Sequence, residues 1–291
     1  MSDGKKCKVP GTLHFFTVDH WFEVPLLIFD WNHFYKKVVM LSFMENDSRK
    51  RKGHVHMAFY HDLSTYYDQI FPLNQTAYAF ISNCFQKGDS IIDMGAGTGN
   101  MAIALAQGGL QVTASEPEET LVESIKKKAA EKGISLSVHT KTMEKLGEFQ
   151  ENFDGILCVG NTLPHLPNIV EVERFLGQCY EKLKENGKLI LQQVNYDKVL
   201  AKDDFSFPVI EKENFTFTRH YEKKNEHIHF TSRLTIDGET IDNTIPLYPI
   251  TSQQLKQALE KVGFQNINQY GNFKEENHTS ESPALVTVAR K

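Results

Sequence analysis

The chain has 291 residues, 40% of them hydrophobic, and a formal net charge of −5 at pH 7. That length allows one large core or two smaller ones. No apolar run approaches the ~20 residues that a transmembrane helix requires, so we expect no membrane partner. The four cysteines lie far apart without a Cys-x-x-Cys pair. This composition is typical of a reduced, cytoplasmic protein without a metal site.

Residues 1–56 differ in composition from the rest of the chain. They contain both tryptophans, nine basic and six acidic residues, and they show neither helical nor strand periodicity. They also lack the basic start, apolar centre and small-residue cleavage site of a signal peptide. We predict an atypical N-terminal extension with two open interpretations: an accessory segment, or non-native sequence that precedes a natural start at Met57.

Residues 57–291 carry 31 acidic and 23 basic residues. Proteins that bind nucleic acid neutralise phosphate groups with lysine and arginine, so this acidic balance argues against a nucleic-acid partner. His54, His56 and His61 lie close together in the sequence, but without matching acids or cysteines they indicate a solvated segment rather than a metal site.

From residue 57 onward the pattern becomes regular. Two amphipathic helices are expected at about 58–70 and 73–86, separated by Pro72, because proline interrupts a helix. Strands and helices then alternate: strand 90–94, helix 98–107, strand 110–115, helix 118–132, strands 135–139 and 154–159, helix 169–184 and strand 187–194. Such alternation predicts an α/β fold with a parallel sheet, helices on both of its faces and a ligand at the carboxyl ends of the strands.

The pattern changes after Tyr196. Alternating apolar and polar residues, typical of half-exposed antiparallel strands, occupy 215–220, 227–236 and 240–247. We expect a small antiparallel cover sheet, inserted at about 197–250, over the mouth of the site. The chain then returns to a helix and two strands at 251–262, 264–271 and 284–290. Residues 57–291 are therefore predicted to form one domain that contains this insertion.

The clearest functional motif is Asp-Met-Gly-Ala-Gly-Thr-Gly at 93–99. An apolar strand ends in Asp93, and a glycine turn of this kind lets the backbone approach a nucleotide-like ligand closely. An acid before the turn would repel a pyrophosphate and attract the ammonium group of a methionine moiety, and the glycine spacing differs from that of dinucleotide-binding proteins. We predict S-adenosylmethionine, not NAD, as the cofactor, with contacts from Asp93, Gly95, Ala96, Gly97 and Gly99.

A second acid supports this cofactor independently. Glu116 ends the next expected strand, 21 positions after Gly95. An acid about 20 residues downstream, at the tip of the second strand, accepts hydrogen bonds from ribose hydroxyls. Because Asp93 and Glu116 are both in register with the glycine turn, a purely structural turn is the weaker interpretation.

Two longer motifs resemble the class I S-adenosylmethionine-dependent methyltransferases. Tyr-His-Asp-Leu-Ser-Thr-Tyr-Tyr-Asp at 60–68 is similar to the helix that precedes the first strand in small-molecule members. Phe-Asp-Gly-Ile-Leu-Cys-Val-Gly-Asn-Thr-Leu-Pro-His-Leu at 153–166 resembles the fourth-strand motif of the glycine N-methyltransferases, and the likeness continues at 195–197, 247–249 and 271–274. The resemblance implies a Rossmann-like class I methyltransferase sheet and methyl transfer to nitrogen or oxygen of a small molecule by in-line displacement.

The same resemblance implies further cofactor contacts. Tyr60 and Tyr67 are expected to cover the sulfonium end of the cofactor, where an aromatic face makes a favourable cation–π contact. For each tyrosine, packing within the helix is the alternative, and for Met143 a core position is the alternative to packing on the adenine. The remaining implied contacts are Thr142, Met143 and Glu144 at the adenine ring and Val159 beside the cofactor.

The acceptor is less well defined. In the glycine enzymes an arginine that clamps the substrate carboxylate directly precedes the triplet at 195–197, and this chain has Val194 there. Without that bidentate clamp we do not expect free glycine as the substrate. His165 is the candidate catalytic residue, since an alcohol or phenol has to lose a proton before methylation; packing is its alternative. The candidate acceptor-binding residues are Asn161, Asn195 and Tyr248.

Two other functions stay open on the sequence alone. One is a catalytically inactive S-adenosylmethionine-binding or sensing protein, which tight cofactor binding without turnover would favour. The other is an oxidoreductase of the same fold class, which NADH binding would favour and which Asp93 and Asn100 disfavour. The sequence predicts neither the identity of the methyl acceptor nor the oligomeric state.

Overall fold

The computed structural model describes residues 12–17, 20–25, 63, 65–202 and 204–291. The chain divides into two compact units, residues 1–56 and residues 57–291. In the first unit, strands β1 (Thr12–Thr17) and β2 (His20–Pro25) pair antiparallel. None of the helices in the described part of the chain has the length and apolar character that crossing a membrane requires.

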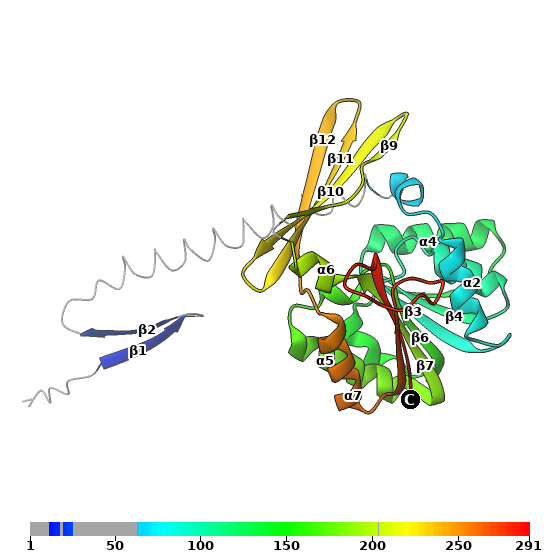
Figure 1. Ribbon diagram of the computed structural model, residues 1–291, viewed down its shortest axis with the longest axis horizontal. Coiled ribbons are helices and arrows are strands. Elements are labelled where there is room, and N and C mark those ends of the chain that lie inside the picture. The colour runs from blue at the N-terminus through cyan, green and yellow to red at the C-terminus, as the bar shows by residue number, and fades with distance from the viewer. Residues whose placement is uncertain (1–11, 18–19, 26–62, 64, 203) are drawn as a thin grey trace, which may run out of the picture. The chain divides into compact units, whose positions relative to one another are not determined.

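A seven-stranded sheet forms the centre of residues 57–291 (Figure 1). In spatial order its strands are β13 (Gln265–Tyr270), β14 (Ala284–Arg290), β7 (Leu183–Val194), β6 (Phe153–Cys158), β3 (Ser90–Met94), β4 (Gln111–Ser115) and β5 (Ser137–His139). The five strands from β7 to β5 are parallel, whereas β14 runs antiparallel to β7 and β13 runs antiparallel to β14. The predicted α/β fold with a parallel sheet is confirmed, with two antiparallel strands at one edge.

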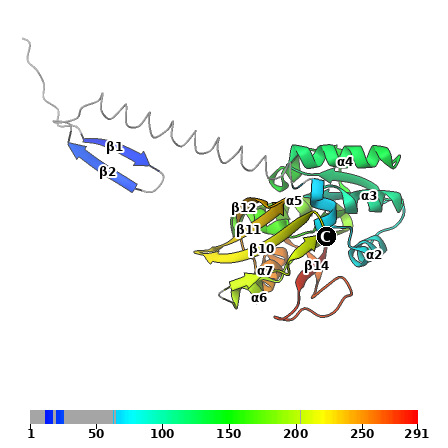
Figure 2. The ribbon, with the colours of Figure 1, turned by 90° about the horizontal axis from the view of Figure 1, so that it is seen from above.

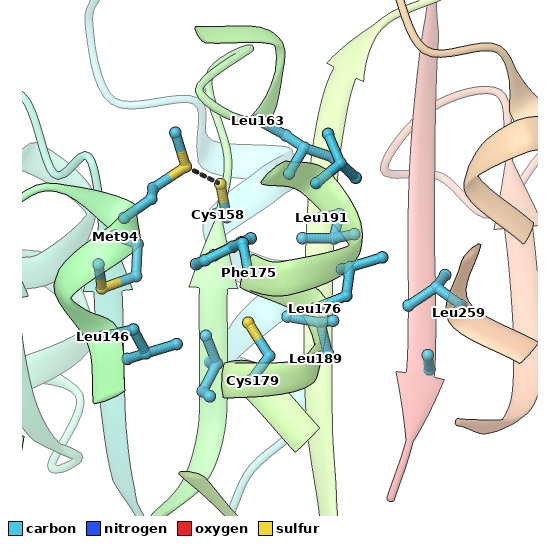
Figure 3. Close-up of a cluster of buried hydrophobic side chains, with 14 of the residues drawn as sticks. Met94, Leu146, Cys158, Leu163, Phe175, Leu176, Cys179, Leu189, Leu191 and Leu259 are labelled. Atoms are coloured by element: carbon cyan, nitrogen blue, oxygen red, sulfur yellow. Dashed lines mark hydrogen bonds between the residues drawn. The ribbon is translucent and has the colours of Figure 1, made fainter. Parts of the chain in front are cut away.

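Helices cover both faces of this sheet. The buried side chains on one face pack with α2 (Gln75–Asn83), α3 (Asn100–Gln107) and α4 (Glu119–Glu131). Those on the other face pack with α5 (Ile169–Lys182), α7 (Ser252–Val262) and the 3₁₀ helix η2 (Met143–Glu148). Consecutive residues of β3 divide between the faces, because Ile91 belongs to the first cluster and Ile92 to the second, as the alternation of a strand requires. Figure 3 shows part of the second cluster, with Cys158 on β6 facing Phe175 of α5.

Local sequence explains where several helices begin. The side chains of Asn74 and Asn168 accept hydrogen bonds from the backbone N–H groups of Ala77 and Glu171, each at 3.0 Å. Thr251 and Gln254 form a capping box at the start of α7. These side chains satisfy backbone donors that have no partner within the helix.

The segment before β3 is helical over the described residues 65–70 and then turns at Pro72 before α2. This agrees with the predicted break at Pro72. The predicted start of that first helix, at residue 58, lies outside the described residues.

The second sheet is antiparallel, as predicted. Its long strands β12 (Glu239–Leu247), β11 (His227–Ile236) and β10 (Phe215–Lys224) lie side by side (Figure 2). Two strands of three residues, β8 (Asp204–Ser206) and β9 (Ile210–Lys212), also pair with β10. They were not predicted, because three residues are too few to show an alternation. Phe215, Phe217 and Tyr221 are buried on one face of β10, and Phe217 packs against Phe71 of the segment before β3.

Candidate active site

The glycine turn joins the end of β3 to the start of α3. Gly95, Gly97 and Gly99 have φ values of +76°, +58° and +80°, a left-handed conformation in which a side chain is strained. A Cβ atom on Gly97 would also lie 2.7 Å from the hydroxyl oxygen of Tyr67. The N–H groups of Gly95 and Ala96 donate to the carbonyl of Ser115, at 2.8 and 3.1 Å. The turn is therefore fixed against β4 and closely covered by Tyr67, and only glycine fits at its centre.

Two buried carboxyl groups lie at this turn. Asp93 is 2% exposed, and its Oδ1 has no hydrogen-bond partner among the described residues. Burial, with a smaller contribution from the charge of Glu116, raises the pKa of Asp93 to about 7. A buried carboxylate without a partner is costly, so Asp93 is suited to a ligand that brings a positive charge.

Glu116 lies at the end of the neighbouring strand β4. Its Oε2 accepts a hydrogen bond from the N–H of Gly97 at 2.9 Å, and its Oε1 accepts one from the N–H of Glu118 at 3.1 Å. Burial raises the pKa of Glu116 to about 7, against these two hydrogen bonds, which lower it. The structure thus brings Asp93, the glycine turn and Glu116 together, as the sequence predicts.

A cavity of about 190 Å³ opens beside the turn. Its lining includes Asp93, Gly95 and Ala96 from the motif, together with Val159 at the end of β6 and Tyr67 from the preceding helix. Other lining residues were not predicted, among them Phe71, Gln192 and Phe273. For Phe273 a clue was present, since it lies within the motif at 271–274.

Asp68 links the segment before β3 to the glycine turn through hydrogen bonds. Its Oδ1 accepts hydrogen bonds from the hydroxyl of Thr98 at 2.5 Å and from the side-chain amide of Asn100 at 2.9 Å. Lys128 of α4 forms an ion pair with its Oδ2 at 2.9 Å. Burial would raise the pKa of Asp68, but its hydrogen bonds to Lys128 and Thr98 hold it below the ordinary value. This positioning network was not predicted, although Asp68 belongs to the motif at 60–68.

Asn161 joins the end of β6 to both β7 and the cover sheet. Its side-chain amide donates to the hydroxyl oxygens of Tyr196 and Tyr221, at 3.2 and 3.1 Å, and its Oδ1 accepts from the N–H of Val194 at 2.9 Å. Burial raises the pKa of Tyr221 to about 12 and that of Tyr196 well above its ordinary value. Both hydroxyl groups therefore stay protonated at neutral pH. Asn161 and the two tyrosines form a neutral polar cluster beside the cavity residue Val159.

The residues expected at the adenine ring differ in their burial. Met143 is 8% exposed and lies in the buried cluster on the α5 face. The Cys158 thiol contacts the sulfur of Met143 at 3.7 Å. Thr142 and Glu144, its neighbours, are less buried. The thioether of Met143 thus packs in the core, which leaves the backbone and the flanking side chains of this segment for a ligand.

The remaining predicted residues differ in their surroundings. Asn195 is 1% exposed, and its amide donates to the carbonyl oxygens of Thr279, Ser280 and Ser282, so it holds a loop rather than facing a cavity. Tyr248 is half-buried, and its N–H donates to the carbonyl of Pro164 at 2.8 Å. The side chain of His165 is exposed on the 3₁₀ helix η3 (Leu163–His165). Tyr60 lies outside the described residues.

Comparison with known proteins gives matches to methyltransferases. A family model described as a methyltransferase domain matches residues 91–187. The glycine/sarcosine N-methyltransferase of Aphanothece halophytica is 28% identical over 211 residues, which cover 69% of this chain and 76% of that enzyme. The ubiquinone biosynthesis O-methyltransferase of Coxiella burnetii is 29% identical over 109 residues, 38% of this chain and 45% of that enzyme. These matches support a class I S-adenosylmethionine-dependent methyltransferase.

A solved structure supports the fold of this methyltransferase. The S-adenosylmethionine-dependent methyltransferase from Clostridium acetobutylicum ATCC 824 superimposes with a TM-score of 0.68 at 15% identity, over 79% of this chain and 98% of that chain. The methyltransferase uses S-adenosylmethionine as its cofactor and transfers a methyl group to nitrogen or oxygen of a small molecule. Its buried Asp93, whose Oδ1 has no partner among the described residues, and the close-fitting glycine turn suit a cofactor that carries an ammonium group.

Proposed function

We propose that Asp93, the glycine turn, Glu116 and Tyr67 hold the cofactor, and that the acceptor binds between the cavity and the cover sheet. The observation that carries this assignment is Asp93, a fully buried carboxyl group whose Oδ1 has no donor among the described residues. An ammonium group would supply the missing positive charge. Glu116 would accept hydrogen bonds from ribose hydroxyls while it keeps those from Gly97 and Glu118.

The protein contributes alignment and exclusion of water. S-adenosylmethionine supplies, when bound, a sulfonium methyl group that a nitrogen or oxygen takes by in-line displacement. Such a step needs little covalent help, so its rate depends on how well the acceptor is held in line. Tyr67 and Phe71 would shield one side of the reacting centre, and the cluster of Asn161, Tyr196 and Tyr221 would orient the acceptor from the other side.

The proton of the acceptor requires a separate assignment. His165 is exposed and is not among the residues that line the cavity, so we propose that it is dispensable for catalysis. An amine acceptor that arrives neutral needs no protein base before the transfer. This favours nitrogen over oxygen as the atom that is methylated, with Asn161 and Tyr248 as candidate acceptor contacts and Asn195 as a structural residue.

The cellular setting and the domain boundary are also proposals. The free cysteines Cys84, Cys158 and Cys179 and the acidic composition favour a cytoplasmic enzyme that does not act on nucleic acid. The two compact units favour residues 57–291 as the methyltransferase domain, with the cover insertion at about 197–250. A truncated chain that begins at Met57 should bind S-adenosylhomocysteine as tightly as the full chain does, and loss of binding would contradict this boundary.

The experiment that tests the function is a transfer assay with a matched inactive variant. The full chain is incubated with S-adenosylmethionine and a panel of small primary amines, secondary amines and phenols. We expect S-adenosylhomocysteine to accumulate together with an equal amount of an acceptor that has gained one CH₂ unit. Asp93→Asn should abolish both signals. Tight cofactor binding without turnover on any acceptor would contradict the proposal and favour a sensing role.

A further inference from the structure

Arg219 is a cation on the inner face of the cover sheet. Residues 216–224 of β10 pair in regular register with β11, so alternate side chains of β10 share a face. Phe215, Phe217, Arg219 and Tyr221 therefore point to the same side, and the three aromatic residues among them are buried. Arg219 is half-buried in this row, which is an unusual place for a charge in a sheet whose other face is exposed to solvent.

The guanidinium lies within cation–π distance of two aromatic rings. Its central carbon is 4.8 Å from the ring centroid of Phe207 and 5.9 Å from that of Phe217. One terminal nitrogen makes a long hydrogen bond of 3.4 Å to the carbonyl of Pro208. Its Nε is buried and has no hydrogen-bond partner among the described residues. The cation–π contacts hold the guanidinium in place, and its Nε–H remains an unused donor.

The neighbours of Arg219 place it beside the cofactor cavity. On one side, Phe217 packs edge-on against Phe71, with centroids 5.8 Å apart, and Phe71 lines the cavity. On the other side, Tyr221 accepts a hydrogen bond from Asn161, two residues after the cavity residue Val159. Arg219 is thus flanked along its strand by the two groups of residues between which the acceptor is proposed to bind.

The positive charge of Arg219 in this position favours binding of a small anion. Burial lowers the pKa of Arg219, although the nearby Tyr221 raises it, and a guanidinium stays charged at neutral pH. Its side-chain neighbours Phe207, Phe217 and Tyr221 carry no charge at neutral pH. A single guanidinium with an unused Nε–H donor matches the single charge and the oxygens of a carboxylate.

We propose that Arg219 is the residue that selects the methyl acceptor, and that this acceptor carries a carboxylate bound by the guanidinium. The proposal rests on the placement of the acceptor beneath the cover sheet given above, and it names the class of acceptor. The aromatic rings around Arg219 would exclude water from the pair, which strengthens a charge-assisted hydrogen bond. A neutral analogue of the acceptor would leave the guanidinium without its partner and bind more weakly.

The test uses binding and needs no knowledge of the acceptor. The full chain is saturated with S-adenosylhomocysteine and titrated calorimetrically with acetate, phenylacetate and longer aliphatic carboxylates, each compared with its own amide, and with inorganic phosphate. Arg219→Gln removes the charge. Arg233→Gln is the matched control, because Arg233 is exposed on the same sheet, on the neighbouring strand β11, and pairs with Asp242 at 2.7 Å.

In the wild type and in Arg233→Gln, we expect at least one carboxylate to bind at least ten-fold more tightly than its amide. In Arg219→Gln this preference should disappear while S-adenosylhomocysteine still binds. If Arg219→Gln fails to bind S-adenosylhomocysteine, Arg219→Lys decides: a weakened preference supports the proposal, and an unchanged one contradicts it. A wild type that binds S-adenosylhomocysteine but shows no carboxylate preference, or prefers phosphate, overturns this inference alone. A wild type that does not bind S-adenosylhomocysteine overturns the proposed cofactor site instead.

Discussion

Replacing Asp93 by asparagine should stabilise the ligand-free protein at alkaline pH while it weakens cofactor binding. The substitution keeps the shape of a side chain that is 2% exposed and removes its charge. Burial raises the pKa of Asp93 from 3.8 to about 7, which corresponds to about 4 kcal/mol of unfavourable free energy once the group is ionised in the folded protein. The functional charge is thus maintained at the expense of stability.

The sign of the effect follows from proton linkage. Between about pH 4 and pH 7 the unfolded chain has lost the proton of Asp93 and the folded protein keeps it, so wild-type stability falls as pH rises through this window and then levels off. The amide that replaces the carboxyl group in Asp93→Asn has no proton to lose in this range. Because Glu116 titrates in the same range and interacts with Asp93, we expect the stability advantage of Asp93→Asn to grow by about 1–3 kcal/mol from pH 5 to pH 8.

Urea denaturation of the ligand-free proteins at pH 5 and pH 8 measures this advantage directly. Asp154→Asn is a useful contrast: although burial raises the pKa of Asp154, its hydrogen bonds to Lys184 and Ser90 hold it below the ordinary value, so that variant should lose stability at pH 8. Calorimetry should show S-adenosylhomocysteine binding weakened at least ten-fold in Asp93→Asn, since a hydrogen bond to a charged group contributes about 1.5–3 kcal/mol. An advantage that does not change with pH, or unchanged affinity, would refute the reasoning.

Three further predictions concern neighbouring groups. Gly97→Ala should weaken S-adenosylhomocysteine binding at least ten-fold in calorimetry, because its Cβ would displace Tyr67. The control Gly133→Ala has a similar φ of +64° and nothing within 4 Å of the added Cβ, so it should lose only about 1–2 kcal/mol of stability through backbone strain. Equal effects of the two substitutions on binding would contradict a role for the contact between Gly97 and Tyr67. In Glu116→Gln the affinity for S-adenosylhomocysteine should fall several-fold. The wild-type affinity should increase between pH 6 and pH 8, because the ionised carboxyl binds the ribose, and this increase should become shallower in the variant. An unchanged pH profile in the titrations would exclude Glu116 as the ribose-binding residue. His165→Asn should keep kcat within about three-fold of the wild type in the transfer assay, whereas a loss of about 100-fold or more would restore His165 as the proton acceptor.

The central sheet could be predicted because its strands and helices are encoded locally. The strand expected at 90–94 coincides with Ser90–Met94, since an apolar run is followed at once by a glycine turn. The expected helix at 169–184 ends at Lys182 instead, because Leu183 is already extended and begins β7. A helix and a strand that follow each other without a loop leave no Gly or Pro signal between them, so the boundary was placed too late.

The site was predictable only in part, for a related reason. Asp93 and Glu116 stand at fixed distances from the glycine turn, so one motif located both. The contact between Asn161 and Tyr221 joins residues that are 60 positions apart, and so does the pair of Asp68 and Lys128. Contacts of this kind depend on how the cover sheet and α4 pack on the strand ends, which no local pattern encodes. The inward direction of Arg219 likewise follows only from the register of β10.

Calorimetric titration of the full chain with S-adenosylhomocysteine and, separately, with NADH tests the central claim most directly. At pH 8, where Asp93 and Glu116 are ionised, we predict micromolar binding of S-adenosylhomocysteine and no binding of NADH. Binding of NADH without binding of S-adenosylhomocysteine would contradict the assignment of Asp93 and Glu116 and, with it, the account of the site.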